Sequence, residues 1–142
     1  MSELLASERF KGRVEWPKVH GNVTWPTFDL VYLGLGKDGH TASLFPKTKA
    51  LTEEDTWVAA NWVEGLGVHR LTLTVPVLNH ARRIMFLVTG SDKAKTLKEV
   101  LMGPRDPVRL PAQLIGPPEG TCQWHVYSSK AGEAPAVLRG GN

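Results

Sequence analysis

The sequence predicts an α/β domain with a mainly parallel sheet. Phe28–Gly34 and Arg83–Thr89 are apolar along almost their whole length, which is typical of strands that are buried on both faces. Helical segments are expected between such strands, and this alternation favours a parallel sheet. In folds of this kind ligands bind at the carboxyl ends of the strands. The loops Gly34–Pro46 and Thr89–Lys93 are therefore the first places to look for chemistry.

Three other segments have the composition of strands. They combine β-branched or aromatic residues with short length or with alternation of polar and apolar side chains. These segments are Trp57–Val63, Arg70–Val75 and Cys122–Tyr127.

Two helices are expected between the strands. Pro76 suits the first turn of a short helix that continues to Arg82. Ser91 suits the N-cap of a second helix, which Gly103 and Pro104 end. We divide the chain into an N-terminal segment with two Trp-Pro breaks, an α/β domain and a flexible tail rich in Gly and Pro, namely residues 1–27, 28–130 and 131–142.

Composition excludes several classes of protein. The 142 residues are 42% hydrophobic and 22% charged, as in one ordinary globular domain. No apolar run is long enough for a membrane span, and the first residues lack the pattern of a secretory signal. The single cysteine, Cys122, excludes an internal disulfide and a Cys-based zinc site. A cytoplasmic location is therefore expected.

The charge is small but unevenly distributed. A net charge of +3 is too low for a dedicated nucleic-acid binder. Residues 69–109 carry 8 Lys/Arg and 3 Asp/Glu, whereas residues 1–68 carry 7 and 9. A basic middle segment fits a small anionic substrate, although on charge alone a solvated surface rich in Lys and Arg is the favoured explanation. The other histidines show no metal-ligand spacing, namely His20, His69, His80 and His125.

The loop after the first strand contains the pattern G-x-G-x-x-G, formed by Gly34, Gly36 and Gly39. After a strand, this pattern is typical of dinucleotide-binding sites. Such sites need a long helix directly after the last glycine, with its N-terminus at the pyrophosphate. Pro46 leaves room for only one or two helical turns, so we reject this interpretation.

The same loop offers Asp38 and His40, two residues apart. Histidine exchanges protons near neutral pH, and a nearby carboxylate can fix its tautomer. An Asp-Gly-His loop at the carboxyl end of a strand is therefore a candidate general-base site. Taken without its surroundings, the triplet is more simply explained as a loop aspartate that makes a turn and a histidine that caps it.

The block FDLVYLGLGKDGHTASLFP, residues 28–46, resembles the central signature of the 6-phosphogluconolactonases, which hydrolyse 6-phosphoglucono-δ-lactone in the pentose phosphate pathway. Two later stretches agree in order and spacing, RLTLTVPVLNHARRIMFLVTGSDKA and LPAQLI with GTCQWHV. The resemblance covers Phe28 to Tyr127. The glucosamine-6-phosphate deaminases share the Asp-Gly-His, but their pattern continues to Phe-Asn-Glu-Pro, where this chain has Ser43–Pro46.

The resemblance implies a Rossmann-like, three-layer α/β fold and a role for each matching residue. His40 is the general base that activates water, and Asp38 orients it. Arg70 contacts the substrate, unless it pairs with a surface carboxylate. Lys93 binds the 6-phosphate beside a helix N-terminus, unless it is an ordinary surface residue. The implied substrate-binding set is completed by Gly36 and Gly39, and no metal or organic cofactor is expected.

The resemblance also implies that the chain is the C-terminal part of the family domain. Nothing before Phe28 resembles the first strand and the Gly-Gly-Ser/Thr phosphate loop of the full-length enzymes. The alternative hypotheses are a non-catalytic or partner-dependent fragment, completed by a chain that supplies the N-terminal half, and a deaminase-like sugar-phosphate enzyme. A small phosphosugar lactone is the expected ligand, with no nucleic acid and no membrane.

Overall fold

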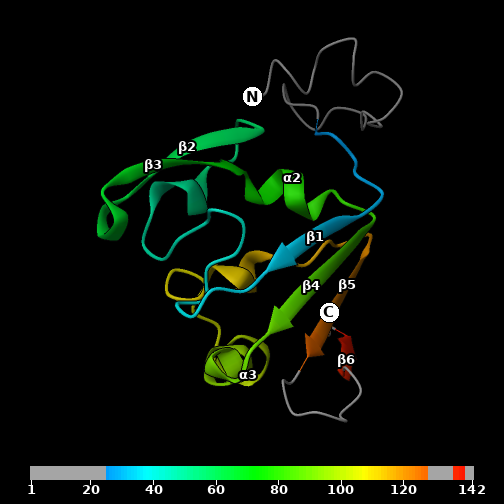
Figure 1. The fold of residues 1–142 in the computed structure, drawn as a ribbon. Coiled ribbons are helices and arrows are strands. Elements are labelled where there is room, and N and C mark those ends of the chain that lie inside the picture. The colour runs from blue at the N-terminus through cyan, green and yellow to red at the C-terminus, as the bar shows by residue number, and fades with distance from the viewer. Residues whose placement is uncertain (1–24, 128–135, 140–142) are drawn as a thin grey trace.

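A computed structural model of the chain describes residues 25–127 and 136–139. The N-terminal segment predicted for residues 1–27 therefore lies almost wholly outside the described residues. The strands are β1 Val31–Gly34, β2 Val58–Val63, β3 Val68–Leu73, β4 Arg83–Thr89, β5 Thr121–Tyr127 and β6 Ala136–Arg139 (Figure 1). The α-helices are α2 Val75–Asn79 and α3 Ala94–Met102, and 3₁₀ helices span Lys49–Thr52, Glu64–Leu66, Ser91–Lys93 and Pro111–Leu114.

The principal sheet has the order β1-β4-β5-β6. β1 pairs with β4 and β4 with β5 in parallel, whereas β6 runs antiparallel to β5 (Figure 1). The α/β fold class with a mainly parallel sheet is thus confirmed. The long connections between the parallel strands carry α2, α3 and the 3₁₀ helices, as a parallel crossover requires.

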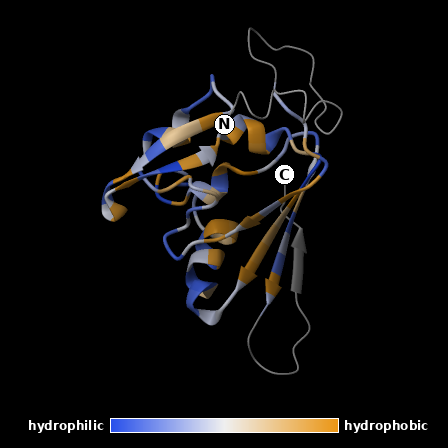
Figure 2. Cartoon of the chain, turned by 45° about the horizontal axis from the view of Figure 1, so that its top comes forward, coloured by the Kyte–Doolittle hydropathy of each residue, from blue (hydrophilic) through white to orange (hydrophobic). Residues whose placement is uncertain are grey.

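One face of this sheet forms the core. Leu33, Phe86 and Trp124 follow one another across β1, β4 and β5, and all three are buried. The rings of Phe86 and Trp124 lie stacked, with centroids 3.7 Å apart. Leu97 and Val100 of α3 join the same buried cluster. Figure 2 shows the result as hydrophobic colour along β4 and part of α3.

The other face is left largely exposed by the described residues, so the prediction that these strands are buried on both faces is wrong for them. Tyr32 of β1 is 60% exposed, Leu87 of β4 47% and Tyr127 of β5 54%. We call the face that carries Tyr32, Met85, Leu87, Gln123, His125 and Tyr127 the open face.

The segments 57–63 and 70–75 do form strands, but not in the parallel sheet. β2 and β3 make a separate antiparallel hairpin in which Val63 is paired with Val68. The turn is the 3₁₀ helix Glu64–Leu66, followed by Gly67 at φ 63°, a left-handed backbone that glycine adopts easily. A connection this short cannot cross over to a parallel neighbour, so the two strands pair antiparallel with each other.

The helices differ from the prediction at their ends. α2 begins at Val75 and ends at Asn79, because the amide of Arg82 already donates to the carbonyl of Phe28 at 2.8 Å. Ser91 is not the N-cap of α3, since a 3₁₀ turn precedes the helix and Lys93 occupies the cap. Gly103 ends α3 as predicted.

The predicted flexible tail, residues 131–142, contains β6. Its backbone pairs with β5 between Gln123 and Val126. The sequence signal was the short apolar run Ala136-Val137-Leu138, which the surrounding glycines and prolines obscured. No helix in the described part of the chain is long and apolar enough to cross a membrane.

Candidate functional site

The glycine-rich loop follows β1 directly and is closed by its own hydrogen bonds. The hydroxyl of Thr41 donates to the carbonyl of Gly34 at 2.8 Å, and the amide of Gly36 donates to the carbonyl of His40 at 2.8 Å. The segment after Gly39 forms a tight turn, bridged between Thr41 and Leu44, and no helix starts there. This agrees with the rejection of a dinucleotide site.

Within this loop Asp38 and His40 form a close pair. The Nδ1 atom of His40 lies 2.6 Å from Oδ1 of Asp38. Because an ionised carboxylate only accepts, Nδ1 is the protonated nitrogen and Nε2 keeps the lone pair. No residue in the described ranges provides a hydrogen-bond partner for Nε2. This arrangement leaves Nε2 available as a base.

Gly36 makes room for this pair. A Cβ atom at position 36 would overlap the Nδ1 and Cε1 atoms of His40 and would lie 2.7 Å from Oδ1 of Asp38. Any side chain here would displace the imidazole. The glycine at this position is therefore explained by the close approach of the histidine to the backbone.

A cavity of about 350 Å³ opens beside the loop. It brings His40 and Gly36 together with Lys93, although Lys93 is more than fifty residues away in the sequence. Lys93 is the N-cap residue of α3, where the helix dipole favours an anion. The remaining lining residues are Tyr32, Leu33, Gly34, Leu35 and Ala42.

Two contacts tie the loop to the helix that carries Lys93. The hydroxyl of Thr96 donates to the carbonyl of Lys37 at 2.6 Å. The ammonium of Lys37 lies 3.0 Å from the carboxylate of Asp92. This hydrogen bond from Lys37 is the largest cause that lowers the pKa of Asp92.

Three of the predicted site residues do not line the cavity, and one of them, Asp38, joins the site through its contact with His40. Gly39, with φ 83°, packs against Leu110, where a Cβ would lie 2.6 Å from Cδ2, so its role here is structural. Arg70 is exposed on β3, opposite Asn61, and does not line the cavity. The structure thus joins four of the six predicted residues, namely Gly36, Asp38, His40 and Lys93.

Sequence reasoning assigned no role to three residues that the structure places at the site. Tyr32 and Ala42 line the cavity, and Ala42 has a left-handed backbone at φ 50°. The ring of Phe45 stacks on the imidazole of His40, with centroids 4.2 Å apart. The only sequence signal for Phe45 was its place in the Ser-Leu-Phe-Pro pattern, and this pattern does not predict that its ring stacks on His40.

The other histidines that the structure describes have different surroundings. His80 bonds through Nδ1 to the carbonyl of Pro76 at 2.9 Å, and His69 packs against Trp62. Nε2 of His125 is buried without a hydrogen-bond partner. His20 lies outside the described residues. Among residues 25–127 and 136–139, no three His, Cys, Asp or Glu side chains are grouped as a metal site would require.

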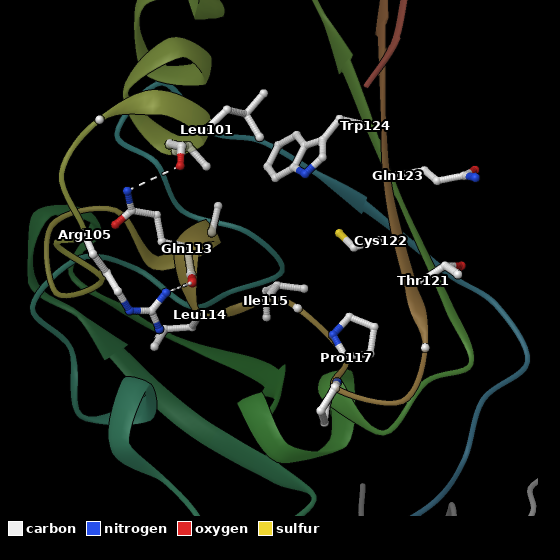
Figure 3. Close-up of a pocket in the computed structure, with 16 residues that line it drawn as sticks. Leu101, Arg105, Gln113, Leu114, Ile115, Pro117, Thr121, Cys122, Gln123 and Trp124 are labelled. Carbon is white, nitrogen blue, oxygen red and sulfur yellow. Dashed lines mark hydrogen bonds between the residues drawn. The ribbon is translucent and has the colours of Figure 1, made fainter. Parts of the chain in front are cut away.

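A larger cleft, of about 1160 Å³, lies between α3, the 3₁₀ helix Pro111–Leu114 and β5 (Figure 3). It contains none of the six predicted site residues. Arg105 is one of its lining residues and donates to the carbonyl of Gln113 at 3.1 Å. Burial raises the pKa of the Cys122 thiol on its wall to about 11, which makes this cysteine a poor nucleophile.

Comparison with known proteins identifies the class to which this geometry belongs. The family model described as glucosamine-6-phosphate isomerases/6-phosphogluconolactonase matches residues 4–124. The match therefore begins upstream of the resemblance described in the sequence analysis, which starts only at Phe28. The chain is 45% identical over 109 residues to the 6-phosphogluconolactonase of Synechocystis sp., covering 77% of this chain and 44% of that protein. It is 42% identical over 107 residues to the human 6-phosphogluconolactonase, covering 75% of this chain and 41% of that protein.

Solved structures agree. A 6-phosphogluconolactonase from Trypanosoma brucei superposes with a TM-score of 0.72 at 28% identity, covering 91% of this chain and 49% of that one. The enzyme from Leishmania guyanensis gives 0.71 at 29% identity, covering 89% and 49%. The chain therefore has the fold of these proteins and spans less than half the length of the relatives it matches.

Proposed function

Because the chain belongs to the glucosamine-6-phosphate isomerase/6-phosphogluconolactonase family, we propose that its site hydrolyses 6-phosphoglucono-δ-lactone to 6-phosphogluconate, a step of the pentose phosphate pathway. The observation that carries this proposal is the Asp38–His40 pair, in which Nε2 has no hydrogen-bond partner among the described residues, at a cavity that Lys93 also lines. A base and a cation at one small cavity match a substrate with a reactive carbonyl at one end and a phosphate at the other.

In the proposed mechanism His40 acts on water. Nε2 accepts a proton as the water oxygen attacks the lactone carbonyl carbon. The tetrahedral intermediate then collapses, the ring C–O bond breaks, and the imidazolium returns the proton to the departing ring oxygen. Asp38 holds the Nδ1–H tautomer and stabilises the imidazolium, as the acid of a catalytic triad does. Backbone N–H groups of the glycine loop are candidates for stabilising the oxyanion.

Lys93 is proposed to bind the phosphate. Its position at the start of α3 adds the helix dipole to its own charge. Arg70 stays a predicted substrate contact. The family resemblance supports this role, but Arg70 does not line the cavity. The phosphate anchor has a catalytic purpose, because it fixes the distance of the carbonyl from Nε2.

The alternative is a fragment that is active only with a partner. The relatives are more than twice as long as the matched part, and the open face exposes Tyr32, Leu87 and Tyr127. We propose that a segment equivalent to the N-terminal half of the relatives, in the same or another chain, covers this face. The lactonase is preferred to the deaminase because Ser43–Pro46 departs from the deaminase pattern. The cytoplasmic location stays a prediction.

The test is lactone hydrolysis by this chain, alone and combined with the N-terminal half of a related lactonase. We expect the combination to exceed the spontaneous rate and His40→Ala to lower it by about 100-fold, the usual scale of general-base help. The His40-dependent rate should also fall at acid pH, since a protonated imidazole cannot accept a proton. His69→Ala is the matched control, because His69 packs on Trp62 of the hairpin. If His40→Ala and the parent hydrolyse the lactone at equal rates after the spontaneous rate is subtracted, the catalytic assignment is wrong.

A second measurement tests the phosphate anchor. Lys93→Ala should weaken binding of 6-phosphogluconate far more than binding of gluconate, because only the first ligand carries the phosphate. Lys95→Ala, two residues further along α3, is the matched control for a general loss of positive charge. Equal losses for both ligands in the Lys93 variant would remove Lys93 from the phosphate site.

A further inference from the structure

The imidazole of His40 has a second close neighbour besides Asp38, the ring of Phe45. The two rings lie nearly parallel, with an interplanar angle of 25° and centroids 4.2 Å apart. Asp38 holds only one atom of the imidazole, Nδ1. A single hydrogen bond restrains the turn of the imidazole about its Cβ–Cγ bond only weakly, and a flat ring stacked on its face also opposes that turn.

Phe45 is itself fixed by the β2–β3 hairpin. The carbonyl of Phe45 accepts a hydrogen bond from the hydroxyl of Thr48 at 2.7 Å. The side-chain amide of Asn61, which is only 2% exposed, donates to Thr48 Oγ1 at 3.0 Å and to the carbonyl of Ser43 at 2.8 Å. Both ends of the short segment that carries Phe45 are thus bonded to one buried side chain of β2.

The other side of the hairpin supports the same segment. The amide of Ser43 donates to the hydroxyl of Thr72 on β3 at 3.2 Å, and Thr72 is buried. The hairpin is not part of the parallel sheet, and its contacts with the loop give it a purpose in the site. It holds residues 43–48 so that the phenyl ring meets the imidazole.

We propose that Phe45 is a positioning residue for His40, whose ring sets the plane of the imidazole and keeps Nε2 directed to the cavity. Phe45 touches neither the substrate nor the transferred proton in this proposal. It acts by restricting His40, with Asp38 holding the tautomer and Gly36 leaving the space. The inference rests on the proposed function, since it concerns the same base.

The first arm of the test does not depend on activity. Nitrogen NMR of the full 142-residue chain, labelled at histidine, reports the tautomer of His40. We expect one dominant Nδ1–H tautomer in the parent and in Phe45→Tyr, which keeps a flat ring. Phe45→Leu and Phe45→Met lack that ring and should shift to a mixture of tautomers. Phe28→Leu is the matched control, because Phe28 is another partly buried phenylalanine and packs on the core instead.

The second arm measures hydrolysis by the chain completed with the N-terminal half. Phe45→Leu should lower kcat by about 10-fold with little change in KM, since misorientation affects the proton transfer and not the phosphate contact. Phe45→Tyr should restore most of the rate. A parental tautomer population in both Phe45→Leu and Phe45→Met overturns the inference, and so does a parental kcat. If His40→Ala is as active as the parent, the proposed function fails, and the tautomer measurement alone decides the role of Phe45.

Discussion

The glycine-rich loop and the open face of the sheet meet at one cavity, which both His40 and Tyr32 line, yet they differ in how well the described residues support them. The loop is held from three sides. α3 contacts it through Thr96, the hairpin through Thr72, and the segment before β5 through Ala112, whose amide donates to Gly39 at 3.0 Å. The described residues give the open face no such support, and Tyr32, Leu87 and Tyr127 are exposed.

The difference means that the geometry around His40 and the stability of the sheet beneath the loop depend on different parts of the molecule. The contacts that orient His40 all lie within residues 34–96, so the base can be formed by this chain. Among the described residues, the sheet beneath the loop buries one face well and leaves the other largely exposed, which lowers the apolar area that stabilises it. We therefore expect local geometry to be less dependent on a second half than overall stability is.

The largest effect should come from comparing the two faces of β4. Phe86→Ala removes a ring that is fully buried against Trp124 and should lower the free energy of unfolding by about 3–5 kcal/mol. Leu87→Ala, one residue further along, removes a side chain that is 47% exposed and should cost less than about 1 kcal/mol. Urea unfolding followed by tryptophan fluorescence measures both values.

A large loss from Leu87→Ala would contradict the comparison, because it would mean that the open face is covered in solution. The same two variants also test the proposal that an N-terminal half covers the open face. With the N-terminal half of a relative present, the cost of Leu87→Ala should rise, and the cost of Phe86→Ala should not.

The fold was predictable where one short pattern decides the structure. The apolar run of β4 identified a central strand, and Gly103 identified the end of α3. The open face was not predictable, because apolar composition shows what a strand is able to bury and not what chain is present to cover it. The same limit applies to β2 and β3, whose composition suits a sheet of either direction.

The site was predictable only for contacts close in sequence. Asp38 and His40 are two residues apart, so a loop brings them together without help from the rest of the fold. Lys93 was predicted from the resemblance, and it lines the same cavity as His40 although the two are far apart in the sequence. The stacking of Phe45 depends on Asn61 and Thr72, which lie on strands with no mark of function in the sequence.

The second prediction contrasts the two faces through thiol reactivity. Burial raises the pKa of Cys122 from the ordinary 9.0 to about 11, so at pH 8 its thiolate fraction is about 100-fold below that of an exposed cysteine. Alkylation by iodoacetamide should be slow at pH 8 and should rise with pH until about 11. The control is Leu87→Cys in a Cys122→Ser background, which places the thiol on the open face. A rate for Cys122 that levels off near pH 9 would contradict its burial.

The smallest effect concerns the support of the loop. Thr96→Val removes the hydroxyl that donates to the carbonyl of Lys37 at 2.6 Å and should lower the free energy of unfolding by about 1 kcal/mol. Since this bond joins the loop of His40 to the helix of Lys93, the KM of the completed enzyme for the phosphorylated lactone should also rise, by about threefold to tenfold. Thr96→Ser keeps the bond and should behave as the parent. Thr52→Val is the matched control, because its hydroxyl bonds only to Lys49 within one 3₁₀ turn, at 3.2 Å. If Thr96→Val and Thr52→Val change stability and KM equally, the Thr96 contact does not couple the base to the phosphate anchor.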